Sequence, residues 1–188
     1  MRAYFNPKND EINQWLDKYA PSKTSYQTAP WIQIKNPKFG ILDTGNEQSA
    51  IEEFRYYVSE KPKNEINKEL ILKIAKKHKC VTGKWIIWLE KKEVDEKWGS
   101  IAKSILDGKL SSFSAKISTN GHPSTSSGEY LVCVYTLDYS EMQEVMKVRE
   151  ELKNLGFTSA LCYKADIYTY LKIYGKNEYG LSEVLYSK

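Results

Sequence analysis

The stretch ALCYKADIYTYLKIYGKNEYG, residues 160–180, decides our prediction of the fold, because it contains a regular alternation of side chains. Between residues 168 and 174, a row of aromatic and basic residues alternates with residues that include Leu171 and Ile173. Successive side chains of a β-strand point to opposite faces, so this period of two predicts a half-buried strand. The outer face of that strand would carry Tyr168, Tyr170, Lys172 and Tyr174.

Such a row of side chains is suited to binding a ligand. Phenol rings stack on flat ligands, and their hydroxyl groups form hydrogen bonds with the edges of a ligand. Lys164 and Asp166, which lie just upstream, would bring both signs of charge to the same place. The alternative is a tyrosine-rich sheet face that a loop or a partner protein covers.

The length of 188 residues is typical of one compact domain, and no linker rich in Gly, Pro or Ser divides the chain. We therefore expect a single domain over residues 31–188, preceded by an arm over residues 1–30 that contains a short helix. No apolar run approaches the roughly 18 residues of a membrane span, and the N-terminus lacks the apolar core of a signal peptide. These features predict a cytoplasmic protein with no membrane contact.

The three cysteines, Cys80, Cys133 and Cys162, are odd in number and scattered along the chain. This distribution predicts free thiols rather than a disulfide framework or a zinc site. The sequence also contains no metal-ligand spacing, no Gly-rich phosphate loop and no nucleophile elbow. We therefore expect no metal and no cofactor.

The net charge is +4, and only three of the 28 basic side chains are arginines. Exposed lysines are common on helix faces, so the charge favours an anionic partner only modestly. Arg149 falls within the apolar stripe of an expected helix, where a guanidinium group needs a negative partner. That partner would be a protein carboxylate, such as Asp138 or Asp166, or else a ligand phosphate.

Capping and periodicity predict the other elements. Thr44 and Ser49 each precede a glutamate by three residues, so a helix should begin between residues 44 and 49. Apolar residues at helical spacing predict further helices, and alternating or continuous apolar runs predict strands. The helices are expected at 9–19, 64–78, 93–107 and 140–156, and the strands at 31–35, 84–89, 113–118 and 130–136. This order predicts an α+β fold with a curved, largely antiparallel sheet and helices packed on one face.

Two of these strands carry further candidates for a ligand site. In the strand at 84–89, Trp85 and Trp88 point to opposite sides, so both can be packing, or one can present its ring to a ligand. We take Trp85 as the candidate for that contact. In the strand at 113–118, Lys116 lies between Ser114 and Ser118, a trio that could hold a phosphate or a carboxylate.

Six segments together resemble a known family. They are GKWIIW at 83–88, VDEKWGSIAKSILDGKL at 94–110, SAKIS at 114–118, LVCVYTLDY at 131–139, VMKVREEL at 145–152 and YKADIYTYLKIYGKNEYG at 163–180. The ordered set resembles the Bles family, which is named after a basophilic-leukaemia-expressed protein. The resemblance covers about residues 31–186. It implies a fold similar to that of the cap-binding translation initiation factor 4E, a curved antiparallel sheet backed by helices, and some relatives of this family are labelled phosphothreonine lyases.

Three functional hypotheses remain open. The first is a module that binds a nucleotide, an RNA end or another phosphorylated ligand through stacked rings and basic side chains. The second is an enzyme of the phosphothreonine-lyase type, with Lys116 or Lys164 as the base of an elimination. The third is a scaffold whose tyrosine face docks another protein. The ligand-binding candidates are Trp85, Lys116, Ser118, Arg149, Lys164, Asp166, Tyr168, Tyr170, Lys172 and Tyr174.

Overall fold

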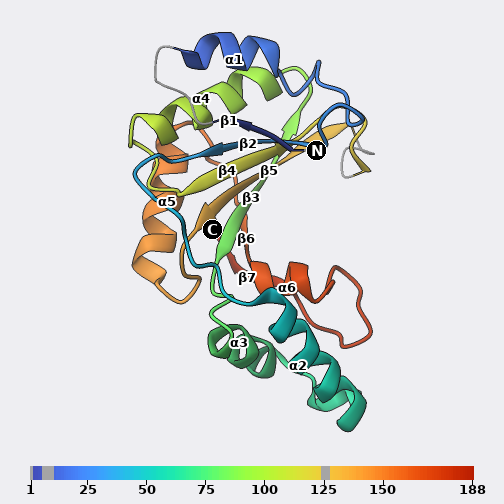
Figure 1. Cartoon of the computed structure of the whole chain (residues 1–188). Coiled ribbons are helices and arrows are strands. Elements are labelled where there is room, and N and C mark those ends of the chain that lie inside the picture. The colour runs from blue at the N-terminus through green and yellow to red at the C-terminus, as the bar shows by residue number, and fades with distance from the viewer. Residues whose placement is uncertain (1, 6–10, 124–127) are drawn as a thin grey trace.

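The structure, a computed structural model, describes residues 2–5, 11–123 and 128–188 and contains one curved sheet with helices around it (Figure 1). Its strands are β1 Arg2–Phe5, β2 Trp31–Lys35, β3 Gly83–Glu90, β4 Ser114–Ser118, β5 Glu129–Thr136, β6 Cys162–Ala165 and β7 Val184–Ser187. They lie in the order β1-β2-β4-β5-β3-β6-β7. The β1 and β2 strands are parallel, and the other neighbouring pairs are antiparallel. The prediction of an α+β fold with a largely antiparallel sheet is confirmed.

One face of the sheet is apolar because alternate residues of each strand point to it. Trp85 of β3 lies opposite Val134 of β5, and both side chains are fully buried. The other buried residues of this face in the middle strands are Ile32, Ile34, Ile87, Leu89, Ala115, Ile117, Tyr130 and Val132. Each buried Å² of apolar surface contributes roughly 25 cal/mol, so this face is the main source of stability.

Two helices, α4 Val94–Leu106 and α5 Met142–Asn154, cover the apolar face, and α1 Ile12–Lys18 packs against α4 (Figure 1). Apolar residues recur every three or four positions in α4, and Trp98 and Ile101 are fully buried there. In α5, the carbonyl oxygen of Val145 accepts a hydrogen bond of 3.0 Å from the indole nitrogen of Trp85. On the opposite, open face of the sheet, Trp88 is 47% exposed.

Three further helices, α2 Glu47–Glu60, α3 Lys68–Lys77 and α6 Asp166–Tyr170, pack together at one end of the sheet (Figure 1). The α2 helix begins within the predicted interval. Its cap is Asn46 rather than Thr44 or Ser49, because the Asn46 side chain accepts a 3.0 Å hydrogen bond from the backbone nitrogen of Ser49. This end of the molecule forms one wall of the site described below.

The N-terminal segment contacts the rest of the chain through backbone pairing and through apolar packing. The β1 strand extends the sheet beside β2, and Ile12 and Trp15 of α1 belong to the common core. The backbone nitrogen of Ser22 also donates a 3.0 Å hydrogen bond to Asp95 on α4. In the part of the chain that the structure describes, no helix has both the length and the apolar character needed to cross a bilayer.

The predicted strand at residues 168–174 is wrong. After β6 the chain forms the short α6 helix and then a turn in which Lys172 has a φ angle of +57°. The helix buries Ile167 and Tyr168, and the turn that follows buries Ile173. Only Ile173 of the predicted inner face is therefore fully buried, whereas Tyr168, which was predicted on the outer face, lies in the core, because a helical turn and a left-handed residue replace the pleat. The last strand of the sheet is β7.

Arg149 is buried, as its position in the apolar stripe of α5 predicts, but its partners differ from both expected kinds. The guanidinium donates hydrogen bonds of 2.8 to 3.0 Å to the backbone carbonyl oxygens of Phe157, Ser159 and Lys188. The expected protein carboxylate is therefore not its partner. The five N–H groups of a guanidinium can serve several acceptors at once, and here they tie α5 to the C-terminal end of the chain.

The close contact between Gly83 and Tyr163 leads to a prediction about stability. A Cβ atom at residue 83 would lie 2.7 Å from Cζ of Tyr163 and would overlap the hydroxyl oxygen of that tyrosine. This hydroxyl group shares a hydrogen bond of 2.5 Å with Thr136 Oγ1. We expect G83A to lower the free energy of unfolding by about 1–3 kcal/mol, as overpacking typically does. Urea unfolding measures this change. In the control G40A the new Cβ meets no atom within 4 Å, and an equal loss in both variants would contradict the prediction.

Candidate functional site

A pocket of about 510 Å³ lies on the open face of the sheet, at the end where α2 and α6 pack. Three basic, two acidic and three aromatic side chains are among those that line it. They are Lys84, Lys116, Lys172, Glu47, Asp166, Phe113, Tyr135 and Tyr170. This volume is within the range of small-molecule sites in proteins.

The register of the strands explains why these side chains meet. Ser114 of β4 lies opposite Tyr135 of β5, Tyr135 lies opposite Lys84 of β3, and Lys84 lies opposite Lys164 of β6. These four residues form one row across four strands, and all four point to the open face. Lys116 is two residues beyond Ser114 on β4, so it shares that face. We call this row the Tyr135 row.

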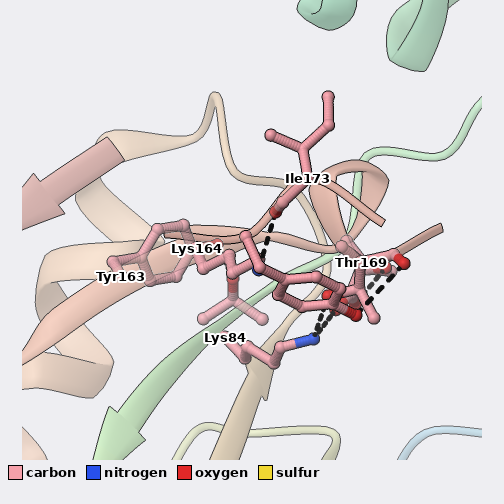
Figure 2. Close-up of polar contacts among 9 residues, drawn as sticks. Lys84, Tyr163, Lys164, Thr169 and Ile173 are labelled. Atoms are coloured by element: carbon pink, nitrogen blue, oxygen red, sulfur yellow. Dashed lines mark hydrogen bonds and ion pairs between the residues drawn. The ribbon is translucent and has the colours of Figure 1, made fainter. Parts of the chain in front are cut away.

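Lys84 is held in place by an ion pair with the first residue of α6. Its side chain is 8% exposed, and its Nζ lies 2.5 Å from Oδ1 of Asp166. The same Nζ donates a 3.0 Å hydrogen bond to Thr169 on α6, and Figure 2 shows Lys84 reaching toward that residue. Thr82 donates a 2.7 Å hydrogen bond to the other oxygen of Asp166. Both oxygens of the buried carboxylate are therefore bonded.

Burial and the neighbouring carboxylate have opposite effects on the pKa of Lys84. Burial works to lower that pKa, because a charged group is less stable away from water. Burial is the largest single effect, but the charge and the hydrogen bond of Asp166, with smaller contributions from Cys133 and Tyr174, together outweigh it, so the pKa of Lys84 is raised above its ordinary value. Lys84 therefore keeps its positive charge at neutral pH.

Lys84 and Lys116 share one aromatic neighbour. The Nζ atoms of Lys84 and Lys116 lie 5.6 Å and 5.8 Å from the ring centroid of Tyr135. Lys116 Nζ also lies 4.2 Å from the centroid of the Trp31 ring. At such distances the ring quadrupole attracts a cation, so these contacts hold both ammonium groups close to the open face.

Lys164 lies next to the pocket rather than in its lining. Its Nζ donates a 3.4 Å hydrogen bond to the carbonyl oxygen of Ile173, which Figure 2 shows, and lies 4.0 Å from the centroid of the Tyr174 ring. Burial lowers the pKa of Lys164 to about 8. Glu183 works in the opposite direction, and Lys84 adds to the lowering. A substantial fraction of this amine is therefore neutral in mildly alkaline solution.

The structure brings together part of the set predicted from the sequence. Lys116, Asp166, Tyr170 and Lys172 all line the pocket, although the last three come from a helix and a turn instead of a strand. Burial raises the pKa of Tyr170 to about 12, so its hydroxyl group stays protonated and can donate. Tyr174 is 50% exposed and packs over Lys164.

Four predicted residues lie away from the pocket lining. Trp85 and Tyr168 have no exposed surface, and Trp88 is the tryptophan of β3 that points to the open face. Ser118 is buried, and its hydroxyl oxygen accepts a 2.9 Å hydrogen bond from the backbone nitrogen of Leu131. Arg149 binds backbone carbonyls on the far side of the sheet, as described above. We assign none of these four to ligand contact.

Sequence reasoning missed Gln33, Lys84, Phe113 and Tyr135 as lining residues. Lys84 and Tyr135 lie within the strands expected at 84–89 and 130–136, but neither is among the ligand-binding candidates. Both side chains point to the open face, because the residues that alternate with them in the strand, Trp85 and Val134, are buried. The relevant signal was the lysine one position before Trp85, because a buried Trp85 requires Lys84 to point the other way. Within the residues that the structure describes, no group of three or more His, Cys, Asp or Glu side chains is placed to hold a metal ion.

Known proteins provide a family match and several distant structural similarities. The model of the family described as basophilic leukemia-expressed protein Bles03 matches residues 46–172. The chain is also similar to C. elegans eIF4E-3 in complex with the 4E-binding protein Mextli and a cap analog, with 15% identity and a TM-score of 0.42 over 48% of this chain and 54% of that one. For Ascaris suum eIF4E-3 with an m2,2,7G cap, the identity is 12% and the TM-score is 0.43 over 58% of each chain.

A schistosome eIF4E complexed with m7GpppA and 4E-BP has 13% identity and a TM-score of 0.42, over 73% of this chain and 81% of that one. The two nematode proteins are matched over little more than half of their length.

The buried ion pair leads to a prediction for D166N. This change removes the negative charge and leaves the Lys84 ammonium buried without a counter-charge, so we expect a loss of about 3–5 kcal/mol in the free energy of unfolding. Urea unfolding checks this. The double variant K84M/D166N should be more stable than D166N alone, because the unpaired charge is gone. A D166N protein that unfolds at the wild-type midpoint would refute the role of the pair.

The lowered pKa of Lys164 leads to a prediction about pH. Its folded-state pKa of about 8 is below the unfolded value of about 10.4, so the folded state binds fewer protons between these two pH values. The contribution of Lys164 to the free energy of unfolding therefore rises between these two pH values, by an amount on the order of 3 kcal/mol. Urea unfolding of the wild type and K164M from pH 7.5 to 10 isolates this effect, because both proteins share the tyrosines. If the two free energies of unfolding differ by the same amount at every pH, the predicted effect of Lys164 is disproved.

Proposed function

We propose that this chain, which belongs to the basophilic leukemia-expressed protein Bles03 family, binds a nucleotide or another phosphorylated ligand on the open face of its sheet. The observation that carries this proposal is the convergence of Lys84, Lys116 and Lys172 with the rings of Phe113 and Tyr135 on one pocket of about 510 Å³. Ammonium groups bind phosphate, and aromatic rings stack on bases, with each stacked base worth about 1–3 kcal/mol.

The lysines of the pocket have different roles in this proposal. Lys84 is paired with Asp166 and orients the wall of the pocket. Lys116 lies beside the rings of Trp31 and Tyr135 and lines the pocket, and these cation–π contacts hold its ammonium group at the pocket. Lys172 approaches from the turn after α6. We therefore assign the phosphate contacts to Lys116 and Lys172.

The rings supply the other half of the recognition. Phe113 and Tyr135 are half-buried and lie with their centroids 5.8 Å apart, so each keeps part of its surface available to the pocket. A ring held by packing loses little freedom when a flat ligand stacks on it. This geometry favours a ligand that combines an anionic group with a planar one.

Binding is better supported than the lyase hypothesis. An elimination needs a base, an acid and a cationic clamp around one phosphate. The two lysines proposed as the base, Lys116 on β4 and Lys164 on β6, are separated by β5 and β3 in the sheet, which corresponds to about 14 Å at the usual strand spacing. Lys164 also lies under Tyr174, beside the pocket rather than in it.

Binding to mononucleotides tests the proposal directly. Isothermal titration calorimetry with AMP, GMP and pyrophosphate in low-salt buffer should show heat of binding for at least one of them. We expect K116M to raise the Kd about tenfold or more, because a charge-assisted hydrogen bond to phosphate is worth roughly 1.5–3 kcal/mol. The matched control is K147M, which removes an exposed lysine of α5 on the covered side of the sheet.

The outcomes separate a specific site from a general charge effect. Equal weakening in K116M and K147M would assign the binding to net charge and would contradict a site at Lys116. The absence of binding for all three ligands, and for a phosphothreonine peptide, with the wild-type protein folded by circular dichroism, would refute the proposal.

A further inference from the structure

A second cavity of about 660 Å³ adjoins the first. The two cavities share Gln33, Thr44 and Phe113 in their linings. The second cavity continues along the segment that connects β2 to α2, where Phe39 and Ile41 line it. Figure 1 shows this segment running down from the end of β2 to α2. The open face therefore offers one continuous depression with two compartments.

A line of three aromatic rings runs through both compartments. Phe39 lies in the second cavity, Phe113 lines both, and Tyr135 lies in the first. The centroids of Phe39 and Phe113 are 6.5 Å apart, and those of Phe113 and Tyr135 are 5.8 Å apart. Their interplanar angles of 64° and 43° leave the three rings tilted rather than stacked face to face. Each of these half-buried rings therefore has room beside it for a separate planar group.

The junction between the compartments also carries an unsatisfied hydrogen-bond acceptor. Gln33 donates a 2.8 Å hydrogen bond from Nε2 to Ser114 Oγ, whereas its buried Oε1 receives no hydrogen bond from the described residues. A buried acceptor without a partner costs roughly 1–3 kcal/mol. A small rotation of the amide would present Oε1 to an N–H group of a ligand at the junction, such as the amino group of a base.

The charges favour an elongated anion. The first cavity contains Lys84, Lys116 and Lys172 against Glu47 and Asp166, and Asp166 is already paired with Lys84. Lys35 lines the second cavity, which has no acidic residue among the described residues that line it. No arginine is among the residues that line either cavity in the described part of the chain. Phosphopeptide sites typically use clusters of arginines, whose forked geometry matches a phosphate group. Lysines combined with a series of rings are instead typical of surfaces that bind single-stranded nucleic acid.

We propose that the second cavity is a base-binding subsite, and that the ligand class of this face is single-stranded nucleic acid of at least two nucleotides. The inference rests on the proposed function, since one nucleotide must first occupy the Lys116 pocket. The base of the adjoining nucleotide then lies against Phe39 and Phe113, where Gln33 contacts its edge. Affinity consequently depends on the length of the ligand.

The test compares ligands that differ only in length. Isothermal titration calorimetry measures the Kd of adenosine 5′-monophosphate, the 5′-phosphorylated dinucleotide pApA and the tetranucleotide pApApApA. We expect the dinucleotide to bind about tenfold more tightly than the monophosphate, because each stacked base contributes roughly 5-fold to 150-fold. The F39A variant should bring the ratio of the two Kd values close to one.

A second variant keeps the test valid if F39A unfolds. The Ile41 side chain is fully exposed and lines the second cavity, so I41E adds a negative charge to that compartment without disturbing the core. We expect I41E to weaken dinucleotide binding about fivefold or more. Its matched controls are I41Q, which lacks the charge, and L137E, which adds the same charge at an exposed apolar residue that lines neither cavity.

The results distinguish this inference from the proposed function. If the monophosphate binds and the dinucleotide binds no more tightly, the second subsite is refuted and the proposed function stands. If a phosphothreonine peptide binds while no nucleotide does, the ligand class is wrong and phosphate recognition remains. If none of these ligands binds to the folded protein, both proposals are refuted.

Discussion

The ion pair between Lys84 and Asp166 connects the sheet to the helices that form the wall of the site. Asp166 is the first residue of α6, and its backbone nitrogen also bonds to the carbonyl oxygen of Thr82 at 2.9 Å. The carboxylate of Asp166 is therefore bound to Lys84 of β3 and to Thr82, and its backbone is bound to Thr82, the residue immediately before β3. This attachment determines where the chain leaves β6, and so where Thr169, Tyr170 and Lys172 face the open side of the sheet.

A buried ion pair of this kind is costly to form and costly to break. The desolvation of two charges offsets much of their attraction, so the pair adds little net stability over an apolar substitute. Its effect is on conformation, because Thr82 and Thr169 complete its hydrogen bonds only when α6 starts at Asp166. Alternative paths for the chain after β6 would leave a buried charge without a partner. The pair thus selects one arrangement of the pocket wall.

The sequence predicted the sheet better than it predicted the site. Periodicity and turn residues gave the middle strands and the long helices within a few residues, because burial on one face imposes a regular pattern. The prediction for the stretch after β6 failed because a short helix buries three consecutive residues, Asp166 to Tyr168, and a left-handed residue then turns Ile173 into the core, a pattern that the alternation of residue types does not reveal. A five-residue helix such as α6 is decided by tertiary contacts, here those of Asp166 and Tyr168, and a local sequence pattern does not show such contacts.

Only some residues of the site were predicted, because the others depend on tertiary contacts that a local pattern does not show. Lys116 was identified because its own strand alternates clearly. The significance of Lys84 depends on the register that places it opposite Tyr135 and Lys164, and register connects residues some fifty to eighty positions apart. The partners of Arg149 are backbone carbonyls, which no side-chain pattern reveals.

The two neighbouring lysines of the Tyr135 row show how the open face accommodates like charges. Lys84 and Lys164 lie directly opposite each other on adjacent strands, an arrangement that is unfavourable when both are charged. Asp166 keeps the proton on Lys84, whereas burial beneath Tyr174 makes the proton of Lys164 easier to lose. The repulsion is thereby reduced without removing either side chain. Lys84 is therefore engaged by its carboxylate and Lys164 is covered by Tyr174, whereas Lys116 and Lys172 are the lysines to which we assign the phosphate contacts.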